Sequence, residues 1–313
     1  MLVGIPIDVP KLLVTGHTGF VGRTLLAEAS SGNIGFEWQP TTLPEGFDVR
    51  DSALADAIAT DPPDAVIHLA ALTSVAESFR DLDRYVDVNF HGTRNLLHAL
   101  RATHFSGCML YVGSGDCYGA VPEADLPIRE DRPLRPRSPY AMSKVAAEAL
   151  CFQSSQTELF DIVIARPFNH VGPAQDNRFA VAAFAQQVAE IAAGKREPRM
   201  LVGDLDVTRD FTDVRDVIRA YVALLSGGRR GEAYNVGSGR ETRLADLLQM
   251  LQDIAGVRCV IETDPSRLRS GEQRRMVADI TKITRQTNWT PRIALERTLR
   301  ETLDYWKGKI ANA

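Results

Sequence analysis

Residues 11–22 read Lys11-Leu-Leu-Val-Thr-Gly-His-Thr-Gly-Phe-Val-Gly22, and this stretch decides the fold of the chain. Its apolar start predicts a short buried strand that ends at Thr15, and glycines follow at once at positions 16, 19 and 22. An amphipathic stretch from Phe20 to about Ala29 predicts a helix directly behind them. Glycines let the backbone approach a pyrophosphate and a helix N-terminus attracts the anion, so the stretch predicts a dinucleotide cradle. A plain tight turn would show the same bare glycine spacing.

Strands and helices continue to alternate through the first half of the chain. Asp64–Ala71 predicts another buried strand, and Asn89 opens a long amphipathic helix that reaches about His104. This alternation predicts an α/β fold, a Rossmann-type doubly wound parallel sheet with a smaller C-terminal α/β substrate-binding lobe. We expect the dinucleotide-binding domain at residues 1–166, with a later return segment near 205–236. The substrate lobe would then cover mainly residues 167–313.

Composition narrows the class of protein. Charged residues make up 24% of the 313 residues and the net charge is −4, which argues against a nucleic-acid or membrane partner. The four cysteines show no metal-binding spacing, and we expect no metal. Neither a ~20-residue apolar run nor a signal-peptide pattern is visible, so we expect a reduced, cytoplasmic protein.

A tyrosine and a lysine one helical turn apart suggest redox chemistry. Ser138-Pro139 predicts a helix start, and Tyr140 and Lys144 then share one face of that helix. A free tyrosine has a pKa near ~10, and a nearby ammonium stabilises its phenolate. Ser114 follows the apolar strand Cys108–Val112, where its hydroxyl could hold a substrate oxygen. Tyr-x-x-x-Lys alone also occurs on solvated helices, so the other motifs are needed to support this interpretation.

The glycine loop, Ser114 and the Tyr140/Lys144 pair, in this order, resemble the extended short-chain dehydrogenase/reductase superfamily. That superfamily acts mainly on nucleotide-linked sugars, and the resemblance covers essentially the whole chain. It extends to the segments Gly113–Gly119, Ala165–Pro173, Val202–Phe211, Tyr234–Gly239 and Arg269–Arg275. Within the superfamily, the chain looks most like the enzymes that reduce the keto group of a GDP-linked 4-keto-6-deoxy sugar.

The resemblance implies a role for individual residues. Ser114, Tyr140 and Lys144 would be catalytic. The cofactor would be bound by Gly16, Thr18, Gly19, Phe20, Val21, Gly22, Asp48, Val49, Leu69, Ala70, Ala71, Asn89, Tyr140, Lys144 and Arg166. The substrate would be bound by Thr73, Ser114, Asp116, Asn169, Arg178, Arg209, Arg269 and Glu272.

Several of these residues also have an ordinary structural explanation. Asp48 lies in Asp48–Asp51, which could simply cap the next helix. Arg209 could form a surface ion pair with a neighbouring aspartate, worth ~0–1 kcal/mol. Asn169 could cap backbone groups of its loop, and Arg269 and Glu272 lie in a basic stretch that could be a solvated face.

The choice of cofactor depends on the end of the second strand, where a carboxylate would bind the ribose of NAD. Residues 36–42 are expected to form this strand; Glu37 lies inside it and no carboxylate stands at its end. No obvious arginine for the 2′-phosphate of NADP stands there either, although Arg23 is close behind the glycine loop. We therefore expect NADPH, with NADH possible. The resemblance also implies a homodimer, built from the helices near 89–104 and 139–156.

Three reactions share this scaffold: keto reduction, 4,6-dehydration and 4-epimerisation. Dehydratases commonly have Asp-Glu or Ser-Glu directly after the serine or threonine, whereas Gly115 and Asp116 occupy these positions here. Glycine cannot transfer a proton, although Asp116 leaves dehydration open. Epimerases typically have Tyr-Phe-Asn where this chain has Pro167-Phe-Asn169. The resemblance therefore implies reduction of GDP-4-keto-6-deoxy-D-mannose to GDP-D-rhamnose. A non-enzymatic alternative is an NADP-binding sensor or scaffold, although such proteins usually lack the tyrosine or the lysine.

Overall fold

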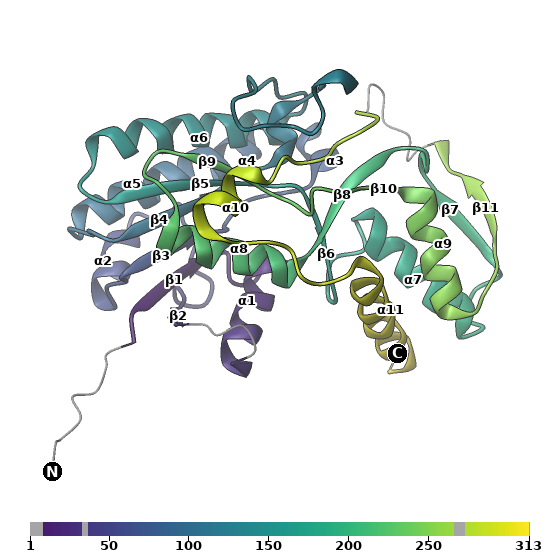
Figure 1. Cartoon of the computed structure of the whole chain (residues 1–313). Helices are drawn as coiled ribbons and strands as arrows, with labels where there is room; N and C mark the ends of the chain where they lie inside the picture. Colours follow the sequence, from purple (N-terminus) through teal and green to yellow (C-terminus); the bar gives the residue numbers. More distant parts are fainter. Residues whose placement is uncertain (1–8, 33–36, 266–272, 313) are drawn as a thin grey trace, which may run out of the picture. The chain divides into compact units, whose positions relative to one another are not determined.

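The computed structural model describes residues 9–32, 37–265 and 273–312. The chain forms two compact units, each built from several segments (Figure 1). Unit 1 consists of Met1–Gly113, Ser138–Ala165 and Tyr221–Ala233. Unit 2 consists of Ser114–Arg137, Arg166–Ala220 and Tyr234–Ala313. The excursion from Gly119 to Arg137, which contains four prolines, is part of unit 2. The domain boundaries expected from the sequence stay a prediction.

A parallel sheet forms the centre of unit 1, as predicted. The described residues form a six-stranded sheet in the order β2-β1-β3-β4-β5-β9. β1 pairs in parallel with β2 and β3, and β4 pairs in parallel with β3 and β5. The bounds are β1 Lys11–Thr15, β2 Gln39–Thr41, β3 Ala65–His68, β4 Cys108–Val112, β5 Asp161–Pro167 and β9 Ala233–Val236. This order confirms the Rossmann-type fold.

Helices cover both faces of this sheet. Their bounds are α1 Phe20–Ser31, α2 Leu54–Thr60, α3 Val75–Ser78, α4 Leu82–Val86, the π-helix η1 Asp87–His91, α5 Gly92–Ala102 and α6 Pro139–Thr157. Alternate strand residues such as Val66 and Met109 pack with Leu96 of α5 and Cys151 of α6 in one core. Figure 1 shows α1 on the opposite side of the sheet from α5 and α6. α6 begins as predicted, because the Ser138 hydroxyl accepts a hydrogen bond from the backbone N–H of Ala141.

Unit 2 contains two smaller sheets and most of the C-terminal helices. One sheet has the order β10-β8-β6, and the other pairs β11 with β7 in parallel. The strands are β6 Asn169–Val171, β7 Arg199–Val202, β8 Thr208–Asp213, β10 Glu241–Arg243 and β11 Val260–Thr263. The helices are η2 Gly115–Tyr118, η3 Glu123–Asp125, α7 Ala180–Ala192, α9 Leu244–Ala255, α10 Thr281–Thr287 and α11 Leu295–Ala311. α8 Val214–Gly227 begins in unit 2, and its residues from Tyr221 onward belong to unit 1. β6 lies within the segment Ala165–Pro173 and pairs with β8.

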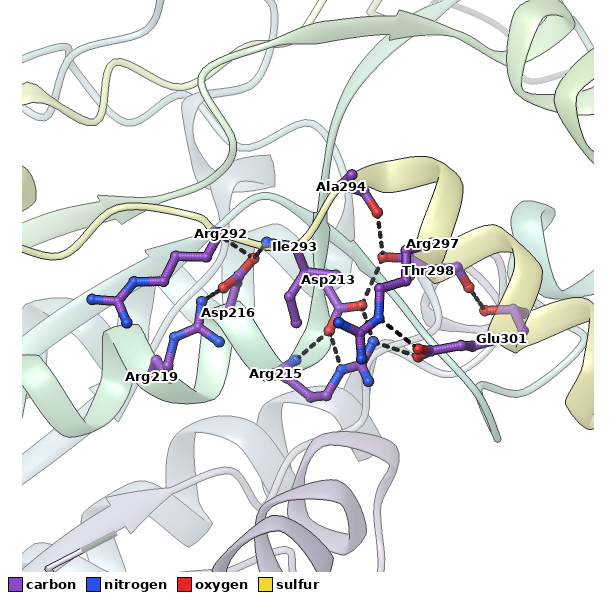
Figure 2. A network of polar contacts seen from close by, with 11 residues as sticks. Asp213, Arg215, Asp216, Arg219, Arg292, Ile293, Ala294, Arg297, Thr298 and Glu301 are labelled. Carbon is purple, nitrogen blue, oxygen red and sulfur yellow. Dashed lines mark hydrogen bonds and ion pairs between the residues drawn. The ribbon is translucent and has the colours of Figure 1, made fainter. Parts of the chain in front are cut away.

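Two buried aspartates tie α11 and the segment before it to β8 and α8 (Figure 2). The Asp216 carboxylate accepts the backbone N–H groups of Arg292 and Ile293 at 3.0 and 2.8 Å and pairs with Arg219. Asp213 accepts two hydrogen bonds from the Arg215 guanidinium, at 2.8 and 2.7 Å, and one from the Thr298 hydroxyl at 2.7 Å. Both aspartates are essentially inaccessible to solvent. These interactions compensate the desolvation of the two charges.

We expect Asp216→Asn to lower the free energy of unfolding by about 2 kcal/mol, because an amide cannot replace the charge that the Arg219 guanidinium faces. The amide would still offer one carbonyl oxygen to the two backbone N–H groups. Asp304→Asn is the matched control, since Asp304 forms only an exposed pair with Lys307 on α11. Urea unfolding curves measure both variants. Equal midpoints for the two variants would contradict the anchoring role of Asp216.

Candidate active site

The glycine loop of unit 1 has the shape of a phosphate cradle. Gly16 has a φ of +69°, and a Cβ built on it would lie 2.6 Å from the backbone nitrogen of Ala70. A Cβ on Gly22 would lie 2.6 Å from the carbonyl oxygen of Gly16. Gly19 is the N-cap of α1 and has no side chain to cap the first N–H groups of that helix. Backbone donors at a helix N-terminus therefore face a turn in which only glycine fits.

The other predicted cofactor residues lie in unit 1 except Arg166. Thr18 lies in the loop, and Phe20 and Val21 begin α1. Leu69, Ala70 and Ala71 directly follow β3, and Ala70 lies against Gly16. Together they surround the loop at the carboxyl ends of β1 and β3, where nucleotide sites of open α/β sheets are found.

Asp48 has a partner of its own. Its carboxylate accepts hydrogen bonds from the Arg50 guanidinium at 2.9 and 2.8 Å, and these lower the pKa of Asp48. The helix cap considered for Asp48–Asp51 is not formed, because α2 has Ala53 as N-cap and no side-chain hydrogen bond there. Val49 is buried beside them and its carbonyl accepts from Asn95. The role of Asp48 and Val49 in binding the cofactor stays a prediction.

The second strand is shorter than expected. β2 spans Gln39–Thr41, so the exposed Glu37 lies before the strand instead of inside it. The Arg23 guanidinium donates a hydrogen bond to the carbonyl oxygen of Thr18 and therefore lies beside the glycine loop. β2 contains no carboxylate, in agreement with the sequence, which shows none at the end of this strand where it would bind the ribose of NAD.

Tyr140 and Lys144 share the buried side of α6, with 8% and 4% of their surfaces exposed. The Lys144 ammonium lies 4.7 Å from the centre of the Tyr111 ring on β4. The Tyr111 hydroxyl donates to the Lys144 carbonyl oxygen at 3.1 Å. The Tyr140 ring meets that of Tyr85 edge-on, with 6.4 Å between centres. Packing on two sides therefore fixes the pair at the end of the sheet where β4 ends.

Asn89, predicted to contact the cofactor, connects the segment after β3 with α6. Its side chain accepts from the backbone N–H of Leu72 at 2.8 Å and donates to the Leu72 carbonyl at 3.0 Å. It also donates to the Ser143 hydroxyl at 2.9 Å, and that hydroxyl donates to the Tyr140 carbonyl at 2.8 Å. Asn89 lies within the π-helix η1, a feature that often marks functional sites. The Asn89 side chain thus binds Leu72 and Ser143, and through Ser143 it supports the backbone of Tyr140.

Ser114 opens the part of unit 2 that follows β4. It is the N-cap of η2, and its hydroxyl accepts the N–H of Asp116 at 3.2 Å. Gly115 packs under Phe168, because a Cβ on it would meet three atoms of that ring at 3.1–3.2 Å. An acidic side chain at 115 would therefore have to displace Phe168. Ser114 is 8% exposed and Asp116 is partly buried.

Arg166, predicted to bind the cofactor, is 7% exposed and belongs to a buried polar network of unit 2. Its guanidinium donates to the Tyr118 hydroxyl at 2.8 Å and to the Glu130 carbonyl at 3.0 Å. The Tyr118 hydroxyl in turn donates to the Asn235 side chain at 2.6 Å. Burial raises the pKa of Glu130, whose carboxylate accepts the backbone N–H of Asn235 at 2.9 Å. This network holds η2 and the excursion in place, and the cofactor role of Arg166 stays a prediction.

The strand that contains Arg209 is held by its neighbour Asp210. The Asp210 carboxylate accepts two hydrogen bonds from Ser238 at 2.6 Å, one from Gly239 at 3.0 Å and one from Ala278 at 3.1 Å. Burial raises the pKa of Asp210 and these bonds oppose the rise. Asp213 is bound by Arg215, as described above, and the Arg209 guanidinium donates to the Thr208 carbonyl at 2.8 Å. Other groups thus satisfy both aspartates.

The remaining predicted substrate residues have different surroundings. Thr73 and Asn169 are exposed, and Asn169 begins β6. Arg178 is exposed and pairs with Asp176 at 3.0 Å. Arg269 and Glu272 lie outside the described residues. Tyr118, Asp210 and Asn235 support the site but were not predicted as site residues; their only signal was a position inside the segments that resemble the superfamily.

The described part of the chain lacks two features. Residues 9–32, 37–265 and 273–312 contain no cluster of three or more potential metal ligands. Within the same ranges, no helix combines the length and the apolar character that a membrane crossing requires. All four cysteines are described and none forms a disulfide.

Known proteins resemble this chain along nearly its whole length. The chain is 44% identical to the GDP-6-deoxy-D-mannose reductase of Pseudomonas aeruginosa over 300 residues, covering 96% of this chain and 98% of the relative. It is 30% identical to a UDP-glucose 4-epimerase of Mycolicibacterium smegmatis, covering 96% and 99%. A solved structure of RMD from Pseudomonas aeruginosa complexed with NADPH matches with a TM-score of 0.90 and 44% identity, covering 96% of this chain and 99% of that one.

The match to a family model agrees with these relatives. The model described as GDP-mannose 4,6 dehydratase matches residues 42–302, which is most of the chain. Its relatives by name include reductases, dehydratases and epimerases that act on nucleotide sugars. A glycine cradle, a buried Tyr140/Lys144 pair and this match together show that the chain belongs to the GDP-mannose 4,6-dehydratase family of extended short-chain dehydrogenases/reductases.

Proposed function

We propose that the protein uses NADPH to reduce the 4-keto group of GDP-4-keto-6-deoxy-D-mannose, forming GDP-D-rhamnose. The observation that supports this most is the 44% identity to a GDP-6-deoxy-D-mannose reductase over 96% of the chain. The relatives named as epimerases and dehydratases are less similar, at 28–31% identity. The substrate class, a nucleotide sugar, is common to all of these relatives by name.

The glycine loop suits the cofactor. The crowding at Gly16 and Gly22 and the uncapped start of α1 fit a pyrophosphate, and Arg23 beside the loop offers a cation to a 2′-phosphate. The similar structure of RMD was determined with NADPH. When bound, NADPH would supply the hydride that reduces the keto carbon. NADH stays possible as a second donor, since other similar structures have NAD bound.

The chain's own groups would manage the proton. The Tyr140 hydroxyl would give its proton to the sugar oxygen as the alkoxide forms, which is general acid catalysis. The Lys144 ammonium, one turn along α6, would stabilise the phenolate that remains. The Ser114 hydroxyl would hold the sugar oxygen by a hydrogen bond. Arg209 would bind the substrate diphosphate, since a guanidinium fork matches phosphate oxygens.

The packing at Gly115 favours reduction over dehydration. A dehydratase needs an additional acid and base, and position 115 offers no proton-transferring group. Phe168 fills the space that a side chain there would occupy, at 3.1–3.2 Å from a Cβ. Asp116 remains as one carboxylate, which is half of such a pair.

One assay tests the proposed function. Purified protein is mixed with NADPH and GDP-4-keto-6-deoxy-D-mannose, NADPH absorbance is followed, and NMR of the product gives the configuration at C4. We expect stoichiometric NADPH oxidation and a rhamno product. A talo product would overturn the stereochemistry alone. If NADPH binds but is never oxidised with any keto sugar nucleotide, the protein is a sensor or scaffold instead.

We also propose a homodimer that pairs through the outer side of α6 and the neighbouring α5. Met142 and Phe152 on α6 are 36% and 53% exposed and offer apolar surface to a second copy of the chain. We expect light scattering to give twice the 34.4 kDa chain mass at micromolar concentration. Replacing both residues by glutamate should give the monomer mass. A monomer mass for the unchanged protein would contradict the proposal. The expected cytoplasmic location stays a prediction.

A further inference from the structure

A buried histidine in unit 1 connects two segments of the cofactor site. His68 ends β3 and is 2% exposed. Its Nδ1 lies 2.7 Å from the hydroxyl of Thr15, the last residue of β1 and the one directly before Gly16. Its Nε2 lies 3.0 Å from the hydroxyl of Thr93 in α5. Both threonines are also buried, at 0% and 1% exposure.

The hydrogen atoms in the bonds that join Thr15, His68 and Thr93 can be assigned in one consistent way. The Thr93 hydroxyl donates to the Asn89 carbonyl at 2.6 Å, so it must accept from His68 Nε2. His68 Nδ1 is then unprotonated and accepts from the Thr15 hydroxyl. The Thr15 oxygen accepts the backbone N–H of Ala70 at 3.3 Å. Burial, with the charge of Lys144 as the smaller cause, lowers the pKa of His68 to about 3, which agrees with a neutral ring.

The series of hydrogen bonds continues to α6, the helix that contains Tyr140. Thr93 holds the carbonyl of Asn89, and the side chain of Asn89 donates to Ser143, which donates to the carbonyl of Tyr140. Every residue along this path is nine-tenths buried or more. The path therefore runs, without an exposed step, from the residue before the glycine loop to the residue that would give the proton.

We propose that His68 is a positioning residue: its ring links Thr15 to Thr93 and thereby holds the glycine loop in register with the helix that contains Tyr140. Both ring nitrogens of the histidine are engaged by the two threonines. An imidazole suits this role because its two nitrogens accept and donate in opposite directions, which no aliphatic side chain of similar volume can do. The inference rests on the proposed function where its effect is measured as kcat. The affinity for NADPH tests it independently of that function.

Thr93→Val removes the hydroxyl and keeps the shape. We expect about tenfold weaker NADPH binding by fluorescence titration and about tenfold lower kcat, because a buried N–H of His68 loses its acceptor. The KM of the keto sugar should change less than about twofold, since the predicted sugar residues Asn169 and Arg209 lie in unit 2. Thr93→Ser restores the hydroxyl and should recover both values to within about threefold.

Thr302→Val is the matched control. Thr302 in α11 is also 1% exposed, and its hydroxyl makes the same bond to the carbonyl four residues earlier, at 2.7 Å to Thr298. It therefore reports the loss of a local helix bond alone. We expect Thr302→Val to lower the melting temperature less than Thr93→Val does, because it leaves His68 fully paired, and to leave NADPH affinity unchanged. Equal affinity for the two variants would overturn the proposal.

A cycle of variants shows whether the histidine itself transmits the effect. Thr93→Val is made in the natural chain and in a His68→Leu background, and NADPH affinity is measured. We expect the threonine change to matter in the natural chain and to change affinity less than about twofold once His68 is gone. An undiminished effect in that background would overturn the proposal. If the natural chain binds NADPH without turnover, the proposed function fails while these affinities still decide the inference.

Discussion

Tyr140→Phe is expected to lower kcat/KM for keto-sugar reduction by about 10²–10⁴-fold, the range that a positioned general acid contributes. Phenylalanine keeps the ring that packs edge-on against Tyr85, so the 8%-exposed site should retain its shape. NADPH affinity should fall by no more than about tenfold, the effect of losing one neutral hydrogen bond to the cofactor, so the rate should fall much further than the binding. Stopped-flow NADPH oxidation measures the rate, and fluorescence titration measures the binding.

The control for this prediction is Tyr85→Phe. Its hydroxyl donates to the carbonyl of Ser74 at 2.6 Å, so the change removes a neighbouring phenol hydroxyl without removing the proposed acid. We expect a rate loss below about tenfold, in line with one neutral hydrogen bond. If Tyr140→Phe retained most of the activity, the proposed acid would be wrong and another group would have to protonate the sugar oxygen.

Gly16→Ala should weaken NADPH binding by about 100-fold or more. An alanine Cβ would lie 2.6–2.8 Å from three backbone atoms of Leu69 and Ala70, and backbone atoms cannot swing aside as a side-chain end can. The φ of +69° adds roughly 1–2 kcal/mol for any residue with a Cβ. The loop must therefore move, and the backbone donors that face a pyrophosphate move with it. Calorimetric titration with NADPH measures the effect.

Gly32→Ala separates the crowding from the backbone angle. Gly32 has a φ of +68°, nearly that of Gly16, but a Cβ there meets nothing within 4 Å. It ends α1 as the C-cap and lies at the opposite end of the helix from the loop. We expect a stability loss of about 1 kcal/mol and unchanged NADPH affinity. Comparable binding by the two variants would contradict the view that close packing shapes the cradle.

Periodicity and local chemistry predicted much of unit 1. β1 and β4 have the bounds expected from their apolar runs, and α6 begins at the expected serine cap. Both strands are buried on two faces, and such strands consist almost entirely of apolar residues. The strand, the glycine loop and the helix start could be read from these local signals, whereas the family resemblance also needed the motifs along the rest of the chain.

Unit 2 was harder to predict because its strands contain charges. β8 reads Thr208-Arg-Asp-Phe-Thr-Asp213, which has no apolar alternation. Asp210 and Asp213 are nevertheless fully buried, since partners at Ser238 and Thr298 satisfy them. Those partners lie 28 and 85 residues away in the chain, so no window of sequence could reveal them. The supports at Tyr118 and Asn235, 117 residues apart, were missed for the same reason.

The anchoring of α11 has a consequence for biosynthesis. Asp213 and Asp216 are enclosed by groups from Arg292 to Thr298, so a nascent chain that has reached only residue 220 has both carboxylates but not these partners. β8, the strand that contains Arg209, therefore reaches its final environment only after translation has passed Thr298. The parallel sheet around the glycine loop can begin to assemble on the ribosome long before that point. A message that stops early would thus yield a chain with a cofactor cradle in which Asp213 and Asp216 keep Arg215 and Arg219 but lack the hydrogen bonds from Arg292, Ile293 and Thr298, a natural target for proteolysis.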